Sequence, residues 1–505
     1  MLKTSFADKF TYKNIEKLLI WVFLTLGVLL RLTMYFQNRD LIIDEVNVIR
    51  NLFERDFFTL LLPLRYEQYA PVFFLWVEEL FSLLFGYGPY SMKAFPLICG
   101  ILSLFVFYRV LKTLPIAGMI WLPLGFFALN PYLIEYSATV KQYISDVLVA
   151  LLLIYAALKM PIYSQTPGKF ALRWIFIGLL AITMSMPAVF ILAAVATYYG
   201  YQTLVRKDWK KIGMLFSIGF CWVAGFGLYY WYILRPQIVS DYLQGYHAPY
   251  FLYLIPQNVN EWKHNYYLIR ELFCCASGFG IYNQIFALSV TVLGMVWLIA
   301  KQRAYLMLIL FPLLLVFLAS ALHQYTLILR VSLFTLPLFL LLLSIGLGFL
   351  SHTLKKWAHL LLLIPGMFFL SQHNKVNLFW NFHGFHELTM GFDYLLEKKV
   401  SGKNLYVHHA SVPTYIYYTT LYPQKDKYAS LKGAHCLHWD TRYTQLGASL
   451  QDTSYLIVTG GFQDEERNRV ISALSENAIQ FDYIERYICF VYGFLPKQPE
   501  QLSND

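Results

Sequence analysis

Long apolar runs separated by short, mostly basic stretches fill the chain up to about residue 371. A bilayer with a hydrocarbon core of about 30 Å needs about 20 predominantly apolar residues for each helical crossing, and about eleven runs approach that length. They lie near residues 17–36, 90–110, 115–132, 144–158, 171–184, 187–204, 212–233, 281–300, 304–321, 328–350 and 358–371. The pattern predicts a polytopic α-helical membrane protein with about eleven transmembrane helices.

One further apolar segment, 71–85, is ambiguous because it carries Glu78 and Glu79 and is only about four helical turns long. The basic clusters farther along the chain decide its assignment. They are Arg109/Lys112, Lys159/Lys169/Arg173, Arg206/Lys207/Lys210/Lys211, Lys301/Arg303 and Lys355/Lys356. If 71–85 lies along the membrane surface as an amphipathic helix, all of these clusters share a side with the basic N-terminus, in agreement with the positive-inside rule. If 71–85 crosses the membrane, they all move to the opposite side. We therefore expect a surface helix.

With this assignment, the N-terminus lies in the cytoplasm and the C-terminal tail lies on the other side of the membrane. The first outer loop, 37–89, then contains amphipathic juxtamembrane helices. The segments 133–143 and 235–280 and the turn at 323–330 face the same side. The topology therefore predicts that any chemistry in these segments takes place on the outer face.

The tail differs in character from the rest of the chain, because short strand-like stretches alternate with helix-like segments. Strands are expected at 404–409, 434–439, 454–460 and 487–494, and helices at 411–420 and 464–477. Such alternation is typical of a small α/β domain. We expect a transmembrane domain, 1–371, followed by a water-soluble α/β domain, 372–505.

Composition agrees with a membrane protein, since 58% of the 505 residues are hydrophobic and only 14% are charged. The net charge of +10 does not indicate a nucleic-acid partner, because the basic residues sit in short clusters between apolar runs. The partner that this pattern indicates is the lipid bilayer. The six cysteines show no metal-binding spacing. Cys436 and Cys489 would be able to pair if the tail lies in an oxidising compartment.

The stretch LIIDEVNVIR, residues 41–50, begins a helix-like pattern with two adjacent acids, Asp44 and Glu45. Successive helix positions are about 100° apart, so the two acids would not share one role. At the rim of a helical bundle, a carboxylate is placed to take a proton from a hydroxyl or amine. It is also placed to help hold a divalent cation such as Mg²⁺ or Mn²⁺ against a phosphate. We predict that Asp44 is a general base and that Glu45 assists it; an ordinary acidic surface loop is the alternative.

A second outward-facing segment, NPYLIEYSATVKQYISD (130–146), carries Lys141 and Tyr143 where two apolar runs reach the outer interface. A cation at this depth suits the phosphate of a lipid carrier lying among the headgroups. The alternative is that the lysine and the tyrosine snorkel at the interface without a ligand. We take both as candidates for binding a lipid phosphate.

A third outward-facing segment, LHQYTLILR (322–330), ends in Arg330 at the start of an apolar run and also holds His323 and Tyr325. An arginine fork binds phosphate oxygens at two points, which lysine cannot do. Snorkelling is again the alternative for Arg330, and a packed or solvated ring is the alternative for His323. Because all three segments are expected on one face, together they predict a site with a base and with cations that neutralise a leaving phosphate.

Over about residues 15–350 the chain resembles the GT-C superfamily of polyprenyl-phosphate-dependent glycosyltransferases. It is most similar to bacterial members such as protein O-mannosyltransferases and the lipid A aminoarabinose transferase. The acidic pair Asp44-Glu45 carries the resemblance together with EQYAPVFFLWVEELFSLLFGYGPYSMKAFPLICG (67–100) and NPYLIEYSATVKQY (130–143).

This resemblance implies transfer of a sugar, with inversion, from a polyprenyl-phosphate donor to an acceptor that the sequence does not identify. The reaction would take place at the outer face of a bacterial inner membrane, with the tail in the periplasm. Asp44 would be the general base, and Lys141 and Arg330 would contact the carrier phosphate.

Two departures from the family pattern bear on a metal site. Tyr69-Ala70-Pro71 stands where the family often has His-Pro-Pro, and Thr139 stands where an acid often precedes the basic residue. Whether a divalent cation is required is therefore left open, and Tyr69 becomes a further candidate residue. Two other functions remain as alternatives: a transporter or flippase of lipid-linked sugars, and a catalytically inactive membrane scaffold.

Overall fold

The computed structural model describes residues 12–116, 118–238, 241–354, 356–373, 387–459, 464–486 and 489–497. Contacts divide the chain into two compact units. The helical unit comprises Met1–Phe36, Phe57–Glu78 and Lys93–Asn377, and the α/β unit comprises Gln37–Asp56, Glu79–Met92 and Leu378–Asp505. Two segments of the expected first outer loop thus belong to the same unit as the C-terminal tail.

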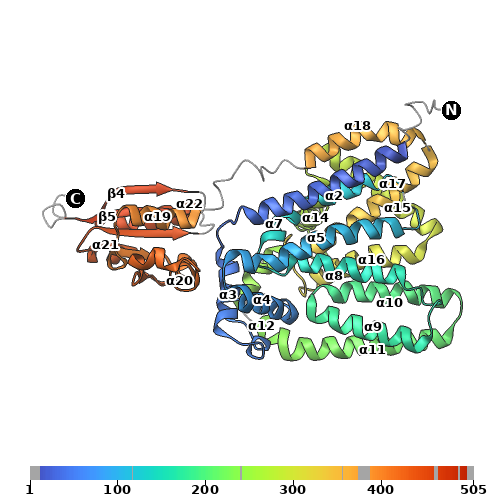
Figure 1. Ribbon diagram of the computed structural model, residues 1–505, viewed down its shortest axis with the longest axis horizontal. Helices are drawn as coiled ribbons and strands as arrows, with labels where there is room; N and C mark the ends of the chain where they lie inside the picture. Colours follow the sequence, from blue (N-terminus) through green and yellow to red (C-terminus); the bar gives the residue numbers. More distant parts are fainter. Residues whose placement is uncertain are drawn as a thin grey trace, which may run out of the picture. The chain divides into compact units, whose positions relative to one another are not determined.

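The chain is a multi-span helical membrane protein. Among the described residues, eight helices are long and apolar enough to cross a bilayer. They are α2 (Tyr12–Phe36), α5 (Pro89–Thr113), α9 (Pro167–Met184), α10 (Ala188–Val205), α11 (Trp209–Tyr229, continued by η3, Tyr230–Leu234), α15 (Ile281–Lys301), α16 (Arg303–Ala321) and α17 (Leu336–Leu354, preceded by η5, Leu333–Thr335). A ninth span results if the bent pair formed by α7 (Pro131–Glu135) and α8 (Tyr143–Lys159) is counted as one. In Figure 1, α9, α10 and α11 lie side by side as long antiparallel rods.

The eight to nine candidate spans among the described residues are fewer than the about eleven crossings expected from the sequence. The apolar run at 115–132 forms only the eight-residue helix α6 (Trp121–Ala128), and every one of its side chains is buried inside the protein. A short apolar run of this kind is a core helix, since eight residues rise only about 12 Å. The run at 358–371 lies in α18 (Lys356–His373), whose described apolar stretch is Leu362–Ser371.

Helix α4 (Val72–Phe85), the segment expected to lie on the membrane surface, has 14 residues and is not among the candidate spans. Its polar face points into the protein, because Glu78 and Glu79 are both buried. Neither carboxylate oxygen of Glu78 has a hydrogen-bond partner among the described residues, and burial raises the pKa of this group well above its usual range. The exposed face is instead apolar and consists of Trp76, Leu80, Leu83, Leu84 and Phe85. Such a helix is suited to contact lipid along its outer side.

Close contacts between small residues join α15 to α17. A Cβ atom on Gly346 of α17 would collide with the carbonyl oxygen of Val290 in α15, and one on Gly294 of α15 would lie 2.5 Å from the carbonyl oxygen of Leu342. Glycine therefore allows the two backbones to touch, as is common where helices associate within a membrane.

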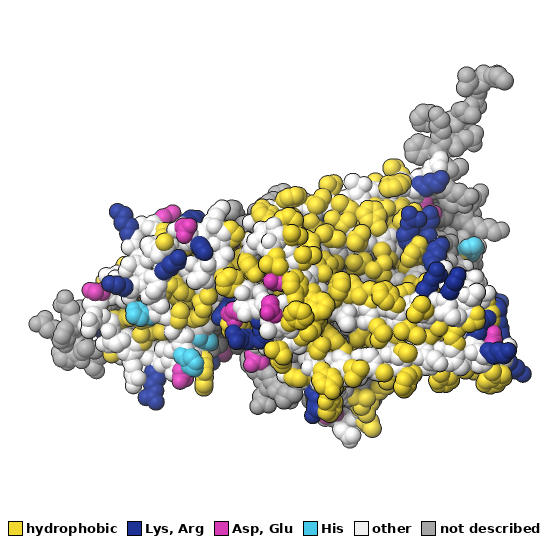
Figure 2. All heavy atoms as spheres, turned by 60° about the horizontal axis from the view of Figure 1, so that its bottom comes forward, with side chains coloured by type: hydrophobic (Ala, Val, Ile, Leu, Met, Phe, Trp, Pro, Cys, Tyr) yellow, Lys and Arg dark blue, Asp and Glu magenta, His cyan; other side chains and the backbone are white. Residues whose placement is uncertain are grey.

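Basic loops gather at one end of the helical unit. The guanidinium of Arg206 and the ammonium of Lys211 lie 4.1 Å and 3.7 Å from the ring centre of Tyr163, so the α8–α9 and α10–α11 connections meet. Figure 2 shows Lys and Arg side chains collected at this end and a broad apolar band across the rest of the face. The grouping is that expected from the positive-inside rule.

In the α/β unit, a five-stranded mixed sheet has the order β2-β1-β3-β5-β4. The strands are β1 (Leu405–Val407), β2 (His435–Cys436), β3 (Ser454–Thr459), β4 (Ala478–Glu485) and β5 (Cys489–Pro496). Strand β1 pairs in parallel with both β2 and β3, whereas β5 runs antiparallel to β3 and β4. Four of these strands overlap the expected ones. Strand β4 was not among the expected strands, although Ile479, Phe481 and Tyr483 alternate with Gln480 and Asp482; it is an edge strand with most of its side chains exposed.

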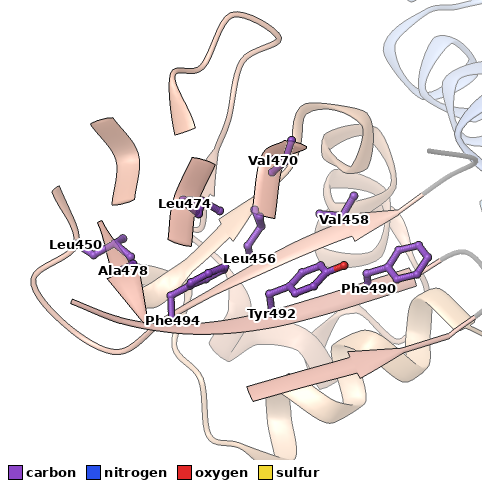
Figure 3. Packing of buried hydrophobic residues seen from close by; sticks show 9 residues of the cluster. All are labelled: Leu450, Leu456, Val458, Val470, Leu474, Ala478, Phe490, Tyr492 and Phe494. Atoms are coloured by element: carbon purple, nitrogen blue, oxygen red, sulfur yellow. The ribbon is translucent and has the colours of Figure 1, made fainter. Parts of the chain in front are cut away.

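Helices cover both faces of this sheet. On one face, Leu456 and Val458 of β3 and alternate residues of β5 pack against α21 (Tyr443–Ser449) and α22 (Asp464–Ser475), forming the apolar cluster in Figure 3. On the other face, α19 (Glu387–Glu397) lies so close that a Cβ on Gly391 would collide with the Cys489 sulfur. The expected small α/β domain is thus a layer of strands between helices.

The pairing of Cys436 with Cys489 that the sequence allowed does not form. Cys436 lies in β2 and Cys489 in β5, and strands β1 and β3 separate them. Neighbouring strands are about 4.8 Å apart, so three steps across the sheet place the two residues about 14 Å apart. A disulfide needs Cα atoms within about 7 Å.

Candidate functional site

The candidate residues fall into two groups, one in each unit. Lys141, Tyr143, Arg330, Tyr69, His323 and Tyr325 belong to the helical unit, whereas Asp44 and Glu45 belong to the α/β unit. The first group surrounds a broken span, and the second occupies the first turn of a short helix.

Lys141 lies at the break between α7 and α8, whose axes differ by 114°. Asn130 begins α7, because its side chain caps this helix by accepting hydrogen bonds from the backbone N–H groups of Tyr132 and Leu133, both at 3.1 Å. The Lys141 side chain is 6% exposed, and its ammonium donates a hydrogen bond to the side-chain oxygen of Gln68. A buried cation at a broken helix is a typical arrangement for binding an anionic group.

Contacts connect Gln68 to Arg330 through two aromatic residues. Tyr69, next to Gln68, places its ring 6.3 Å from the imidazole of His247. Burial and the positive charge of Arg330 lower the pKa of His247, and the ring of His247 lies 5.4 Å from that of Tyr246. Arg330 donates a hydrogen bond of 2.9 Å to the hydroxyl of Tyr246. The structure therefore brings Lys141, Tyr69 and Arg330 into one connected group.

Tyr325 extends this group. Burial raises the pKa of its hydroxyl well above the usual range, and the nearby Asp146, Tyr69 and Tyr143 raise it further. The hydroxyl donates a hydrogen bond of 2.7 Å to the carbonyl of Val331. Tyr325 thus stays protonated and lies close to Tyr69 and Tyr143, as a hydrogen-bonding group rather than a charged one.

His323 lies apart from this arrangement. Its ring stacks on Phe251 at 4.9 Å, its backbone has φ of +58°, and its side chain is exposed. This is the packed and solvated state that the sequence left as the alternative for this histidine.

In the α/β unit, helix α3 (Ile43–Glu54) holds the acidic pair in its first turn. The Glu45 carboxylate is fully buried, pairs with Arg39 at 3.1 Å, and accepts the Ile42 backbone N–H at 3.1 Å. It is therefore engaged in closing the N-terminus of its own helix. Asp44, one position earlier on the helix, is only partly buried. The two acids have different surroundings, as their spacing on a helix requires.

Gln68, Tyr246 and His247 were not among the residues expected from sequence. Gln68 sits inside the segment 67–100 that resembles the family, directly before Tyr69, and the other two lie in the outer loop 235–280. The position of Gln68 beside the 67–100 motif is the one signal that the sequence offers for it. That position does not reveal that Gln68 contacts Lys141.

For a divalent cation, the described residues contain no group of three or more His, Cys, Asp or Glu side chains arranged to hold one. Cation dependence therefore stays a prediction from sequence.

The sequence matches no family model and no curated protein. Solved structures are nevertheless similar along almost its full length. ArnT from Cupriavidus metallidurans in the apo state superposes with a TM-score of 0.54 and 12% identity, over 94% of this chain and 97% of that one. ArnT from the same organism bound to undecaprenyl phosphate gives a TM-score of 0.53 and 13% identity, over 94% and 98% of the two chains. The chain therefore has the fold of ArnT, a GT-C polyprenyl-phosphate aminoarabinose transferase.

Proposed function

We propose that this protein is a glycosyltransferase that moves a sugar from a polyprenyl-phosphate carrier to an acceptor at the outer face of a bacterial inner membrane. The observation that carries the proposal is the shared fold with ArnT, which has been seen with undecaprenyl phosphate bound. The connected group of Lys141, Tyr69 and Arg330 around a broken span supports it, since such a group suits a lipid phosphate at headgroup depth.

In the proposed reaction, Asp44 takes a proton from a hydroxyl or amine of the acceptor. The freed electron pair attacks the anomeric carbon from the side opposite the phosphate, so that configuration inverts. The bond between the anomeric carbon and the phosphate oxygen breaks, and polyprenyl phosphate leaves with the bonding electrons. Lys141 and Arg330 stabilise the negative charge that develops on the phosphate, and Tyr143 is expected to donate a hydrogen bond to it.

The test compares cells that carry the wild-type chain with cells that carry Asp44→Asn, using mass spectrometry of cell-surface lipids and glycans. One mass increment corresponding to a sugar is expected to disappear in the variant, while the protein remains in the membrane at its usual level. Asp452→Asn, which changes an exposed acid of the same unit, is the matched control and is expected to leave the products unchanged. Full activity of Asp44→Asn would refute the assignment of the base.

Binding of the carrier is tested separately from chemistry. Purified protein in lipid nanodiscs is titrated with undecaprenyl phosphate and followed by native mass spectrometry. We expect retained binding in Asp44→Asn and weaker binding in Lys141→Met. A transporter of lipid-linked sugars would bind the carrier but leave every acceptor unmodified, so the two measurements together separate the enzyme from that alternative.

A further inference from the structure

The segment that carries Asp44 is hydrogen-bonded to the last quarter of the chain. Asp40, which is 7% exposed, accepts the backbone N–H of Thr389 at 2.8 Å and the Thr389 hydroxyl at 2.9 Å and 3.2 Å. Thr389 occupies the first turn of α19. The first N–H groups of a helix have no partner within it, and the helix dipole favours a negative charge there. Asp40 therefore caps a helix that lies 349 positions farther along the sequence.

A second bond fixes the next residue. The backbone N–H of Leu41 donates to the hydroxyl of Tyr418 at 3.1 Å, across 377 positions of sequence. Tyr418 is 1% exposed in η8 (Tyr417–Leu421), and its ring lies 6.0 Å from Phe392 of α19. Residues 40 and 41 are thus held between two elements of the α/β unit immediately before α3 begins.

Helix α3 starts two residues after Leu41, so its position follows from these bonds. The ion pair between Arg39 and Glu45 ties the first turn of α3 back to the same short segment. From Arg39 to Glu45 the chain is therefore held at both ends, and Asp44 lies inside this closed stretch. A residue in a loop without such contacts would sample many positions. It would lose conformational entropy whenever it adopted the single position that the reaction requires.

We infer that the C-terminal α/β unit positions the general base, with Asp40, Thr389 and Tyr418 as positioning residues for Asp44. The inference rests on the proposed function and gives a role to the tail that the sequence left without one. Catalysis by a general base requires its oxygen within hydrogen-bond reach of the proton it removes, and a displacement of about 1 Å costs about 100-fold in rate. A hydrogen-bonded clamp on residues 40 and 41, shortly before α3, meets this requirement.

The experiment measures steady-state sugar transfer by the full-length protein in nanodiscs for Thr389→Val, Tyr418→Phe and Thr389→Ser. Thr389→Val and Tyr418→Phe are each expected to lower kcat about tenfold while the KM for the lipid donor changes by less than about twofold. Thr389→Ser keeps the hydroxyl and is expected to restore kcat. Tyr394→Phe is the matched control, because Tyr394 is also on α19 but its hydroxyl bonds to Asp482 at 2.7 Å and does not reach residues 37–56.

Hydrogen exchange of the α3 amides gives a second measurement that does not depend on turnover. It is expected to become faster in Thr389→Val and Tyr418→Phe, and to stay unchanged in Thr389→Ser and Tyr394→Phe. Wild-type kcat in both clamp variants, or an equal loss in Tyr394→Phe, would overturn the inference. Inactive Asp44→Asn together with fully active clamp variants refutes the clamp alone, whereas fully active Asp44→Asn refutes the base and the clamp together.

Discussion

The helical unit and the α/β unit assemble their polar groups over very different lengths of chain. In the helical unit, Lys141 meets Gln68 across 73 positions. In the α/β unit, Asp40 meets Thr389 across 349 positions, and Leu41 meets Tyr418 across 377. Residues 37–56 therefore complete their structure only with residues after 378.

The two units also surround their charged groups differently. The ammonium of Lys141 donates a hydrogen bond to the neutral side-chain oxygen of Gln68. The acid Glu45 is instead matched with an arginine and a helix N-terminus. A buried ion pair of this kind is part of the local structure, and loss of one partner is destabilising. We therefore expect substitution of Lys141 to affect ligand binding and substitution of Glu45 to affect folding.

The largest effect is expected from Glu45→Ala. This change removes the carboxylate that pairs with the buried Arg39 and closes the first turn of α3, at a cost of about 3–5 kcal/mol in the free energy of unfolding. Thermal unfolding of the purified protein measures it, with Asp44→Asn as the neighbouring control, which is expected to change stability by less than about 1 kcal/mol. Equal stability losses for the two variants would contradict the division of roles within the acidic pair.

Next in size is a contrast between two leucines. Leu456→Ala removes a buried side chain from the cluster of Figure 3 and is expected to destabilise the α/β unit by about 3 kcal/mol. Leu83→Ala changes a side chain of α4 that is 62% exposed and is expected to leave unfolding within about 0.5 kcal/mol of wild type. Thermal unfolding compares the two. A large loss for Leu83→Ala in detergent would show that its exposed face is covered by protein rather than by lipid.

For the helical unit we expect an effect on the ligand. Lys141→Met replaces the lysine with an uncharged side chain of similar length. Sugar transfer is expected to fall about 100-fold, and undecaprenyl phosphate is expected to bind more weakly. Lys301→Met, which changes an exposed lysine at the C-terminal end of α15, is the control. Activity of Lys141→Met within about threefold of wild type would remove Lys141 from the phosphate site.

The smallest effect concerns pH. Burial and the neighbouring His409 lower the pKa of His408 to about 3 from its ordinary value of 6.5. As pH falls below 6.5, the unfolded chain takes up the proton first, so the contribution of His408 to stability is complete above pH 6.5 and is lost progressively towards pH 3. The slope is expected to be about 1 kcal/mol per pH unit.

His408→Phe should flatten this dependence between pH 6.5 and pH 4.5, whereas His435→Gln, which changes an exposed histidine of β2, should not. The apparent unfolding temperature of the α/β unit at several pH values measures the difference. An identical pH profile for His408→Phe and wild type would show that other groups control acid stability.

Some features of the site could be predicted because they depend on short stretches of sequence. The acids of LIIDEVNVIR begin a helix, as their pattern indicates, and Lys141 lies two residues before the start of α8. Their partners could not be predicted in the same way. Nothing in the sequence near Lys141 indicates Gln68, and nothing near Asp40 indicates Thr389, because these contacts form only when distant elements pack together.

By itself, the sequence determined that this is a multi-span helical membrane protein with a small α/β region at its end, since burial in lipid and burial in a sheet impose different periodicities. Only the tertiary structure decided which apolar runs form long helices, because a run such as Trp121–Ala128 is equally apolar whether protein or lipid surrounds it. It also decided that Cys436 and Cys489 lie on separated strands and that Gln37–Asp56 and Glu79–Met92 belong to the same unit as the C-terminal residues. These outcomes depend on which surfaces meet, and long-range contacts leave no local pattern.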